Sequence, residues 1–296
     1  MELSDKKFAV LIDADNISHR KIKDILDEIA NYGTPTIKRI YGDFTDPKFA
    51  AWKSVLLENS ITPIQQYAYT TGKNATDSAL IIDAMDILHK ESVNGFCIVS
   101  SDSDYTRLAS RIRESGREVL GFGEKKTPKP FIKSCDKFIY VEILGQPAPA
   151  PAPVSAPAQT AAAVPAAKAA TPKKTAKKHQ GRNAPETDMP EAAPAEPAAA
   201  EKKVAPAPQP IIRPIDDDFK TLLANTIEDA ADDSGWAFLG IVGGVLTKKM
   251  PDFDPRNYGY KKLSLLVKSL SKIVEIEERP SENKELKLVY VRNRIR

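Results

Sequence analysis

Cysteine, histidine and long apolar runs are scarce in this 296-residue chain, and each shortage excludes a class of protein. Two cysteines, Cys97 and Cys135, are too few for a disulfide scaffold or a four-ligand zinc site, and they favour a reducing, cytoplasmic location. No run approaches the roughly 18 apolar residues of a transmembrane helix, so we expect no membrane partner. Residues 1–7 are charged and lead directly into a strand-like run, which predicts no signal peptide.

Neither charge sign dominates, because 43 lysines and arginines stand against 40 aspartates and glutamates. The composition is nevertheless uneven, since residues 146–210 hold 14 prolines and 22 alanines in 65 positions and contain no aromatic residue. A segment without hydrophobic periodicity cannot offset the entropy of ordering, so we expect a long disordered linker there. The linker separates two segments, 1–145 and 211–296, each long enough to bury the core of a small domain.

The first segment alternates between short apolar runs and amphipathic stretches. Strands are expected at 8–12, 36–41, 61–69, 95–99, 118–122 and 137–141, and helices at 17–33, 47–58, 77–89 and 104–114. Strands that alternate with helices of this length predict right-handed crossovers and a mostly parallel sheet covered on both faces. The expected fold is a Rossmann-like α/β domain.

The last segment predicts three short helices followed by a hairpin. Acidic residues 216–218 suit the N-terminus of the first helix. The helices are expected at 219–230, 238–249 and 258–270, and the two strands at 273–278 and 286–291. This order predicts a winged helix, a variant of the helix-turn-helix.

Aspartates follow two of the predicted strands at the point where each strand ends. Asp13 ends the first strand, with Asn16 three residues later, and Asp102 and Asp104 follow the strand at 95–99. In open α/β sheets, ligands bind outside the carboxyl ends of the strands, where the strand order reverses. If these two strands flank that point, the three aspartates face one crevice, and Asp77 at the start of the third helix reaches the same rim.

Carboxylates gathered in one pocket repel one another, and a bound divalent cation removes that conflict. Oxygen ligands without histidine or cysteine favour Mg²⁺ or Mn²⁺ over zinc. Such an ion lowers the pKa of a bound water and stabilises a leaving oxygen, which is the chemistry of phosphodiester hydrolysis without a protein nucleophile. Each aspartate taken singly also suits a helix cap, and Asp83 and Asp86, further along the third helix, are expected to be solvated.

Three segments resemble the NYN domain of the PIN-like nucleases, namely residues 8–16 (FAVLIDADN), 74–80 (NATDSAL) and 98–105 (IVSSDSDY). The resemblance covers about 1–145 and implies a compact α/β fold that cuts RNA with metal ions. It also implies a catalytic set in which Asp13, Asp77, Asp102 and Asp104 ligate the metal, and in which Asn16 orients a carboxylate or a phosphate. Ser101 departs from the pattern, because many relatives carry glycine there.

Two further segments, 235–240 (GWAFLG) and 251–263 (PDFDPRNYGYKKL), resemble the OST-type helix-turn-helix, or LOTUS, domain. That family is a winged helix associated with RNA binding, so the resemblance implies an RNA partner, and protein partners through the same domain are a further expectation. The candidate phosphate contacts are Arg256, Lys261 and Lys262 here and Lys73 and Arg107 in the first segment. A solvated surface also explains each of these basic residues taken singly.

Three functions remain open from the sequence. The leading hypothesis is a metal-dependent ribonuclease whose C-terminal module recruits RNA across the tether. The second is an RNA-binding adaptor without catalysis. In the third, residues 13–15 resemble the first motif of haloacid-dehalogenase phosphatases, in which Asp13 would be the nucleophile of an aspartyl-phosphate intermediate, although no lysine is convincingly placed for that chemistry.

Overall fold

The computed structural model describes residues 6–67, 75–145, 213–280 and 287–294. The predicted linker at 146–210 and the candidate Lys73 lie outside these residues. Within the described ranges, no helix combines the length and the apolar surface needed to cross a membrane.

The N-terminal part is built on a six-stranded sheet in which all the strand pairs are parallel. Its strands are β1 (Lys7–Asp13), β2 (Thr34–Gly42), β3 (Thr62–Gln65), β4 (Gly95–Val99), β5 (Glu118–Gly123) and β6 (Lys137–Tyr140). They lie in the order β3-β2-β1-β4-β5-β6, so the order reverses between β1 and β4. The predicted α/β fold class is therefore confirmed, and β1, which ends at Asp13, is the neighbour of β4, which precedes Asp102.

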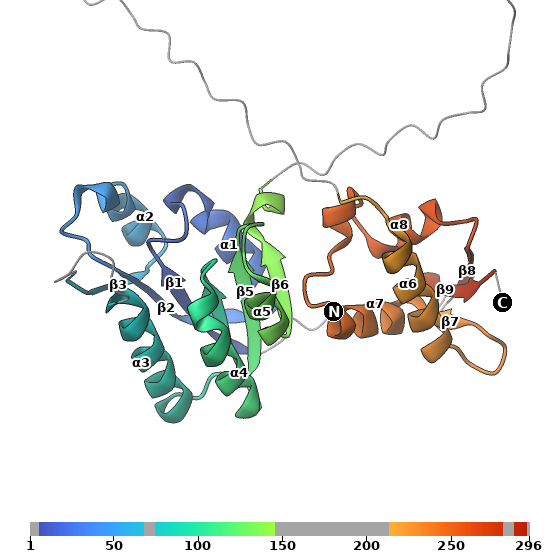
Figure 1. The fold of residues 1–296 in the computed structure, drawn as a ribbon, viewed down its shortest axis with the longest axis horizontal. Coiled ribbons are helices and arrows are strands. Elements are labelled where there is room, and N and C mark those ends of the chain that lie inside the picture. Colours follow the sequence, from blue (N-terminus) through green and yellow to red (C-terminus); the bar gives the residue numbers. More distant parts are fainter. Residues whose placement is uncertain (1–5, 68–74, 146–212, 281–286, 295–296) are drawn as a thin grey trace, which may run out of the picture. The chain divides into compact units, whose positions relative to one another are not determined.

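Helices cover both faces of this sheet (Figure 1). They are α1 (Ile22–Ile29), α2 (Trp52–Glu58), α3 (Ala75–Lys90), α4 (Thr106–Glu114) and α5 (Lys129–Ser134). Helices α3, α4 and α5 pack on one face, against Ala9 and Leu11 of β1, whereas α1 and α2 pack on the other, against Val10 and Ile12. Because both faces of β1 are buried, its sequence is a continuous apolar run rather than an alternating one.

Among the described residues of this part, α5 is the α-helix that the sequence pattern did not predict. It has six residues, and Pro128 and Pro130 flank its first residue, Lys129. Proline is tolerated in the first turn of a helix, where its missing N–H would have no partner. A helix this short shows too few apolar repeats for its period to be recognised.

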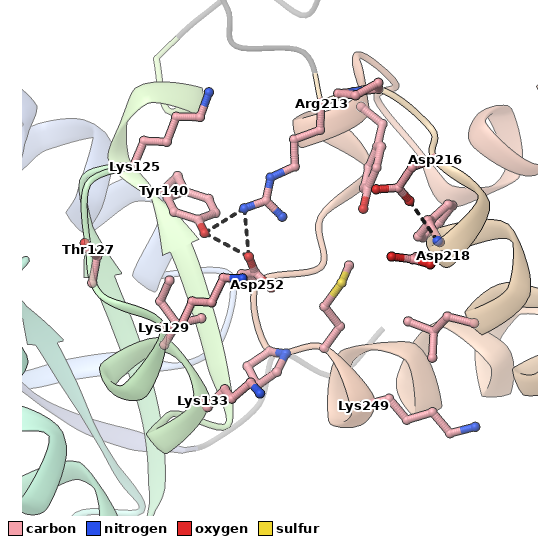
Figure 2. Close-up of a pocket in the computed structure, with 17 residues that line it drawn as sticks. Lys125, Thr127, Lys129, Lys133, Tyr140, Arg213, Asp216, Asp218, Lys249 and Asp252 are labelled. Carbon is pink, nitrogen blue, oxygen red and sulfur yellow. Dashed lines mark hydrogen bonds and ion pairs between the residues drawn. The ribbon is translucent and has the colours of Figure 1, made fainter.

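The described residues of the C-terminal part form three α-helices and a three-stranded antiparallel sheet. Its helices are α6 (Asp217–Asp229), α7 (Leu239–Lys249) and α8 (Leu263–Ser269), and its strands are β7 (Ala237–Phe238), β8 (Val274–Pro280) and β9 (Lys287–Asn293), in the order β7-β9-β8. Asp216 caps α6, because its Oδ1 accepts a hydrogen bond of 2.8 Å from the Phe219 amide (Figure 2). Fully buried side chains from α6, α7 and α8 (Leu223, Val242 and Leu266) share one apolar core with Val291 of β9.

Candidate active site

The carboxyl ends of β1 and β4 bring two polar segments together at the point where the strand order reverses. Ile12 pairs with Val99, so Asp13 on one strand and Ser100 after the other lie side by side. The Ser100 hydroxyl donates a hydrogen bond of 2.9 Å to Oδ2 of Asp13. The two strands whose carboxyl ends carry the predicted residues are therefore adjacent, and the strand order reverses between them, which is where ligands bind in open α/β sheets.

Asp13 is almost completely enclosed, with 1% of its surface exposed. The Asn16 side-chain amide donates to its Oδ2 at 2.6 Å, and the Asp15 backbone N–H donates to its Oδ1 at 3.1 Å. Together with the bond from Ser100, these donors fix both carboxylate oxygens. Asn16 is thus one of the side chains that hold the Asp13 carboxylate in place.

Three other predicted aspartates, Asp77, Asp102 and Asp104, form a cluster in which one oxygen from each lies within 4.8 Å of the others. Asp77 is in the first turn of α3, while Asp102 and Asp104 are on the loop and 3₁₀ turn that follow β4. Asp102 also caps this turn, since its Oδ1 accepts from the Asp104 amide at 2.9 Å. Asp102 therefore both caps the 3₁₀ turn and contributes an oxygen to the carboxylate cluster.

Tyr105 links Asp13 to this cluster, and sequence reasoning did not identify it. Its side chain is completely buried, and its hydroxyl lies 2.7 Å from Asp77 Oδ1 and 3.4 Å from Asp13 Oδ2. A phenol has one proton to donate, and the shorter distance assigns it to Asp77. The available signal was the tyrosine immediately after the Asp-Ser-Asp sequence, but only the folded chain shows where its hydroxyl points.

The pKa values of the site follow from burial and from like charges. Burial raises the pKa of Asp13; hydrogen bonds from Asn16 and Ser100 oppose this shift, and the charge of Asp77 adds to it. Burial also raises the pKa of Asp77, against the hydrogen bond from Tyr105 and with the charges of Asp102 and Asp104.

Among the described residues, no basic side chain is a leading cause of either shift. Burial, followed by the charge of Asp13, raises the pKa of the Tyr105 phenol, so it remains a donor. A cluster of carboxylates without histidine or cysteine suits a hard divalent cation, whose charge would favour the ionised forms of Asp13 and Asp77.

Two nearby aspartates have other partners. Asp15 forms an ion pair of 2.8 Å with Lys48, so its charge is balanced locally. Asp83, which the sequence placed among solvated residues, instead accepts hydrogen bonds from the side chains of Arg39 and Tyr41 on β2. That expectation was wrong because a contact with another strand leaves no trace in the spacing of the helix itself.

The residues predicted to contact RNA differ in how exposed they are and in the partners they have. The Arg107 side chain is 84% exposed and makes a long contact of 3.6 Å with Glu114. Lys261 and Lys262 are exposed before α8. Arg256, in contrast, is held by Asp254, whose oxygens accept from its Nε at 3.0 and 3.1 Å and from its Nη2 at 2.7 Å.

Comparison with protein families gives two matches. The model of the NYN domain matches residues 7–143, and the model of the OST-HTH/LOTUS domain matches residues 210–286. No curated protein matches this chain.

Two solved structures are similar to parts of the chain. An NMR structure of an uncharacterized protein from Nitrosomonas europaea is 34% identical, covers 34% of this chain and 93% of its own, and gives a TM-score of 0.26. A crystal structure of a protein of unknown function from Vibrio parahaemolyticus is 20% identical, covers 47% of this chain and 94% of its own, and gives a TM-score of 0.39.

Proposed function

On the premise that this chain joins an NYN domain, of the PIN-like nuclease group, to an OST-HTH/LOTUS domain, as its sequence motifs predicted, we propose that it is a metal-dependent ribonuclease. The N-terminal domain hydrolyses RNA phosphodiester bonds with Mg²⁺ or Mn²⁺. The C-terminal domain binds RNA and, being on the same chain, raises the local concentration of substrate at the nuclease.

The observation that carries the proposal is the carboxylate cluster of Asp77, Asp102 and Asp104 within 4.8 Å, beside the buried Asp13 at the switch point of the sheet. Like charges this close repel one another, so the arrangement destabilises the fold unless a cation is bound. PIN-like nucleases cut RNA with divalent metals, and this cluster offers the carboxylate oxygens that such ions prefer.

In this proposal the cluster holds the ion, and the surrounding residues hold the cluster. When bound, Mg²⁺ or Mn²⁺ lowers the pKa of a bound water and stabilises the leaving oxygen of the phosphodiester. Tyr105 fixes Asp77 by donating to its Oδ1, while Asn16 and Ser100 fix Asp13. These donors orient the carboxylates as outer-shell partners orient the ligands of other metal sites.

The phosphatase hypothesis loses support from the same geometry. A nucleophilic aspartate must present an oxygen to the substrate phosphorus. Asp13 is 1% exposed, and donors from Asn16, Ser100 and the Asp15 backbone occupy both of its oxygens. We therefore assign Asp13 a role in supporting the metal site rather than in attack.

The test is cleavage of labelled single-stranded and structured RNA in Mn²⁺ or Mg²⁺, comparing the wild type with Asp102→Asn. Asparagine keeps a side-chain oxygen for the helix cap but removes the charge, so a loss of cleavage is not explained by a lost cap. Asp86→Asn is the matched control, because Asp86 is an exposed residue of α3 whose partner is Lys90.

We expect at least about a hundredfold loss of cleavage in Asp102→Asn, since even outer-shell changes at metal sites cost roughly 10–100-fold, and no loss in Asp86→Asn. A wild-type chain that binds RNA but cuts none of it in either metal would contradict the proposal and favour an adaptor. Hydrolysis of a small phosphate ester through an adduct on Asp13 would contradict it in favour of a phosphatase.

A further inference from the structure

The segment that follows β5, the strand next to β4, concentrates positive charge. Residues 125–133, here called the lysine segment, contain Lys125, Lys126, Lys129 and Lys133 and no acidic residue, and all four lysines are exposed. Figure 2 shows Lys125, Lys129 and Lys133 on this stretch of chain, which runs from the β5–α5 loop into α5. None of these lysines was among the predicted RNA contacts.

The topology places the start of the lysine segment at the same edge of the sheet as the cluster. Strand β5 is the parallel neighbour of β4, so the residues that follow Gly123 and those that follow Val99 leave the sheet at one edge. The loops are also bonded to each other, because the Glu124 amide donates to the Ser101 hydroxyl at 2.8 Å.

Two contacts therefore anchor the lysine segment to the candidate active site. Ser101, which is 6% exposed, precedes Asp102 directly, so the departure from glycine at this position supplies the bond between the loops. On α5, the Phe131 ring packs against Tyr105 with centroids 6.4 Å apart, and Tyr105 in turn contacts Asp77. The lysines are thus carried on a segment whose position is coupled to two members of the cluster.

The charges of the lysine segment are weakly compensated by the protein. Lys126 has an exposed ion pair of 2.9 Å with Glu124, whereas Lys125, Lys129 and Lys133 form none with the residues that the structure describes. Lys129 and Lys133 are four residues apart on α5 and so lie on one side of it. A nuclease site made of carboxylates repels the phosphates of its substrate, and adjacent cations offset that repulsion.

We propose that the lysine segment binds the backbone phosphates of the RNA strand whose scissile bond lies at the carboxylate cluster. This inference rests on the proposed function and adds the surface that positions the substrate. Ammonium groups contact phosphates as point charges, so the binding is independent of base sequence and weakens as salt rises.

The test uses the full chain and a triple variant, Lys125→Ala, Lys129→Ala and Lys133→Ala. The matched control removes three exposed lysines from other helices, Lys23→Ala, Lys53→Ala and Lys90→Ala, which changes the net charge equally. The affinity for a labelled single-stranded RNA is measured against salt in EDTA, where no cleavage occurs. The lysine-segment variant should lose about 2 units of salt slope, at about 0.7 per phosphate contact, and the control should lose none.

A second measurement separates this surface from RNA held by the C-terminal domain. RNA containing 4-thiouridine is photo-crosslinked to the wild type, and the modified peptides are mapped; we expect crosslinks within 124–134. With Mn²⁺, the variant should show a raised KM and an unchanged kcat. An unchanged salt slope together with no crosslink in 124–134 would overturn the inference.

Failure of the nuclease proposal would look different. A wild type that cuts no RNA, but whose salt slope falls in the lysine-segment variant, would leave the RNA surface standing and remove only the cleavage. Cleavage that depends on Asp102, combined with the same salt slope in both lysine variants, would retain the nuclease and remove the surface.

Discussion

At the edge of the N-terminal sheet, oxygens of Asp77, Asp102 and Asp104 lie within 4.8 Å of one another. In the C-terminal domain, by contrast, the buried Asp254 lies against Arg256, and Asp252 accepts from Arg213 Nη2 at 2.9 Å (Figure 2). The first arrangement collects charge of one sign, and the second pairs each charge with its opposite. Pairing within the domain is what a structural role requires, whereas collecting like charges is useful only if something else neutralises them.

In the sheet of the C-terminal domain, as in its loops, charged side chains have partners within the domain. Arg292 pairs with Glu275 at 2.7 Å, and its guanidinium also lies 4.7 Å from the centre of the Trp236 ring. Arg279 lies 4.4 Å from the centre of the Tyr290 ring. Trp236 is half-buried under these cations, so its packing has a structural explanation.

The largest effect expected from this comparison is the loss of metal-dependent stability in the double variant Asp77→Asn, Asp102→Asn. At a hundred to a thousand times the dissociation constant, Mn²⁺ should stabilise the wild-type N-terminal domain by about 3–4 kcal/mol. The double variant should gain nothing from Mn²⁺, because two of the three clustered charges are gone. Unfolding is followed by the fluorescence of Trp52, in a Trp236→Phe background.

In EDTA, the same double variant should be more stable than the wild type, because repulsion within the cluster has been removed. Asp27→Asn, on the exposed face of α1, serves as the control and should change neither result. Equal stabilisation of wild type and double variant by Mn²⁺ would show that the cluster is not the metal site.

The second-largest effect is a loss of folding stability in Asp254→Ala, which removes one partner of a charge pair. This change removes the cap of the 3₁₀ helix Pro255–Tyr258 and leaves Arg256 without the carboxylate that accepts three of its hydrogen bonds. We expect a loss of about 2–3 kcal/mol, towards the lower end of the cost of breaking a buried pair, because Arg256 is partly exposed. Chemical denaturation followed by Trp236 fluorescence measures it, in a chain whose Trp52 is replaced by phenylalanine.

Asp254→Asn provides the matched comparison, since it keeps the capping oxygen but not the charge. It should fall between the wild type and Asp254→Ala. A loss below about 0.5 kcal/mol for alanine, the range of ordinary surface substitutions, would mean that pairing does not stabilise this domain and that the comparison fails.

Much of the candidate site could be predicted because it depends on backbone rules. The β4 strand was predicted with its observed bounds, and the order of the sheet meets the condition that β1 and β4 flank the point of reversal. Under that condition the sequence placed Asp13 and Asp102 near one another. Lys73, which was predicted to contact RNA, lies outside the described residues and stays a prediction.

The remainder of the site depends on where side chains point after folding. Tyr105 reaches Asp77 from its place on a 3₁₀ turn, and the Ser101 hydroxyl meets the Glu124 amide across two loops. Asp83 meets Arg39 across the gap between a helix and a strand. Such contacts join residues tens of positions apart, and a single sequence holds no periodicity that reports them.

The third prediction concerns pH in the metal-free protein. Folding raises the pKa of Asp13 and Asp77, so the native state holds more protons than the unfolded chain once the pH passes the unfolded value of about 4. Stability therefore falls as the pH rises through the interval between the unfolded and folded pKa values, and it then levels off.

A pH series of unfolding in EDTA, with Trp52 as the probe, measures this decline. In Asp77→Asn the decline should be shallower, because one titrating carboxylate is gone and the charge that acts on Asp13 has been removed. A wild type whose stability rises over the same interval as fast as that of the variant would contradict the assigned direction.

The smallest effect is expected where a pair is exposed. Lys249 Nζ lies 2.6 Å from Asp229 Oδ2, but 35% of the lysine side chain and 62% of the aspartate side chain are open to solvent. Lys249→Gln should cost no more than about 0.5 kcal/mol, because water and salt already screen such a pair.

The contrast with Asp254→Ala tests burial rather than distance, since the hydrogen-bond lengths of the two pairs are similar. Raising the salt to about 1 M, where the Debye length is about 3 Å, should abolish the effect of Lys249→Gln and leave most of the effect of Asp254→Ala. If both losses disappeared together, both C-terminal pairs would behave as surface pairs. The comparison would then rest on the N-terminal cluster alone.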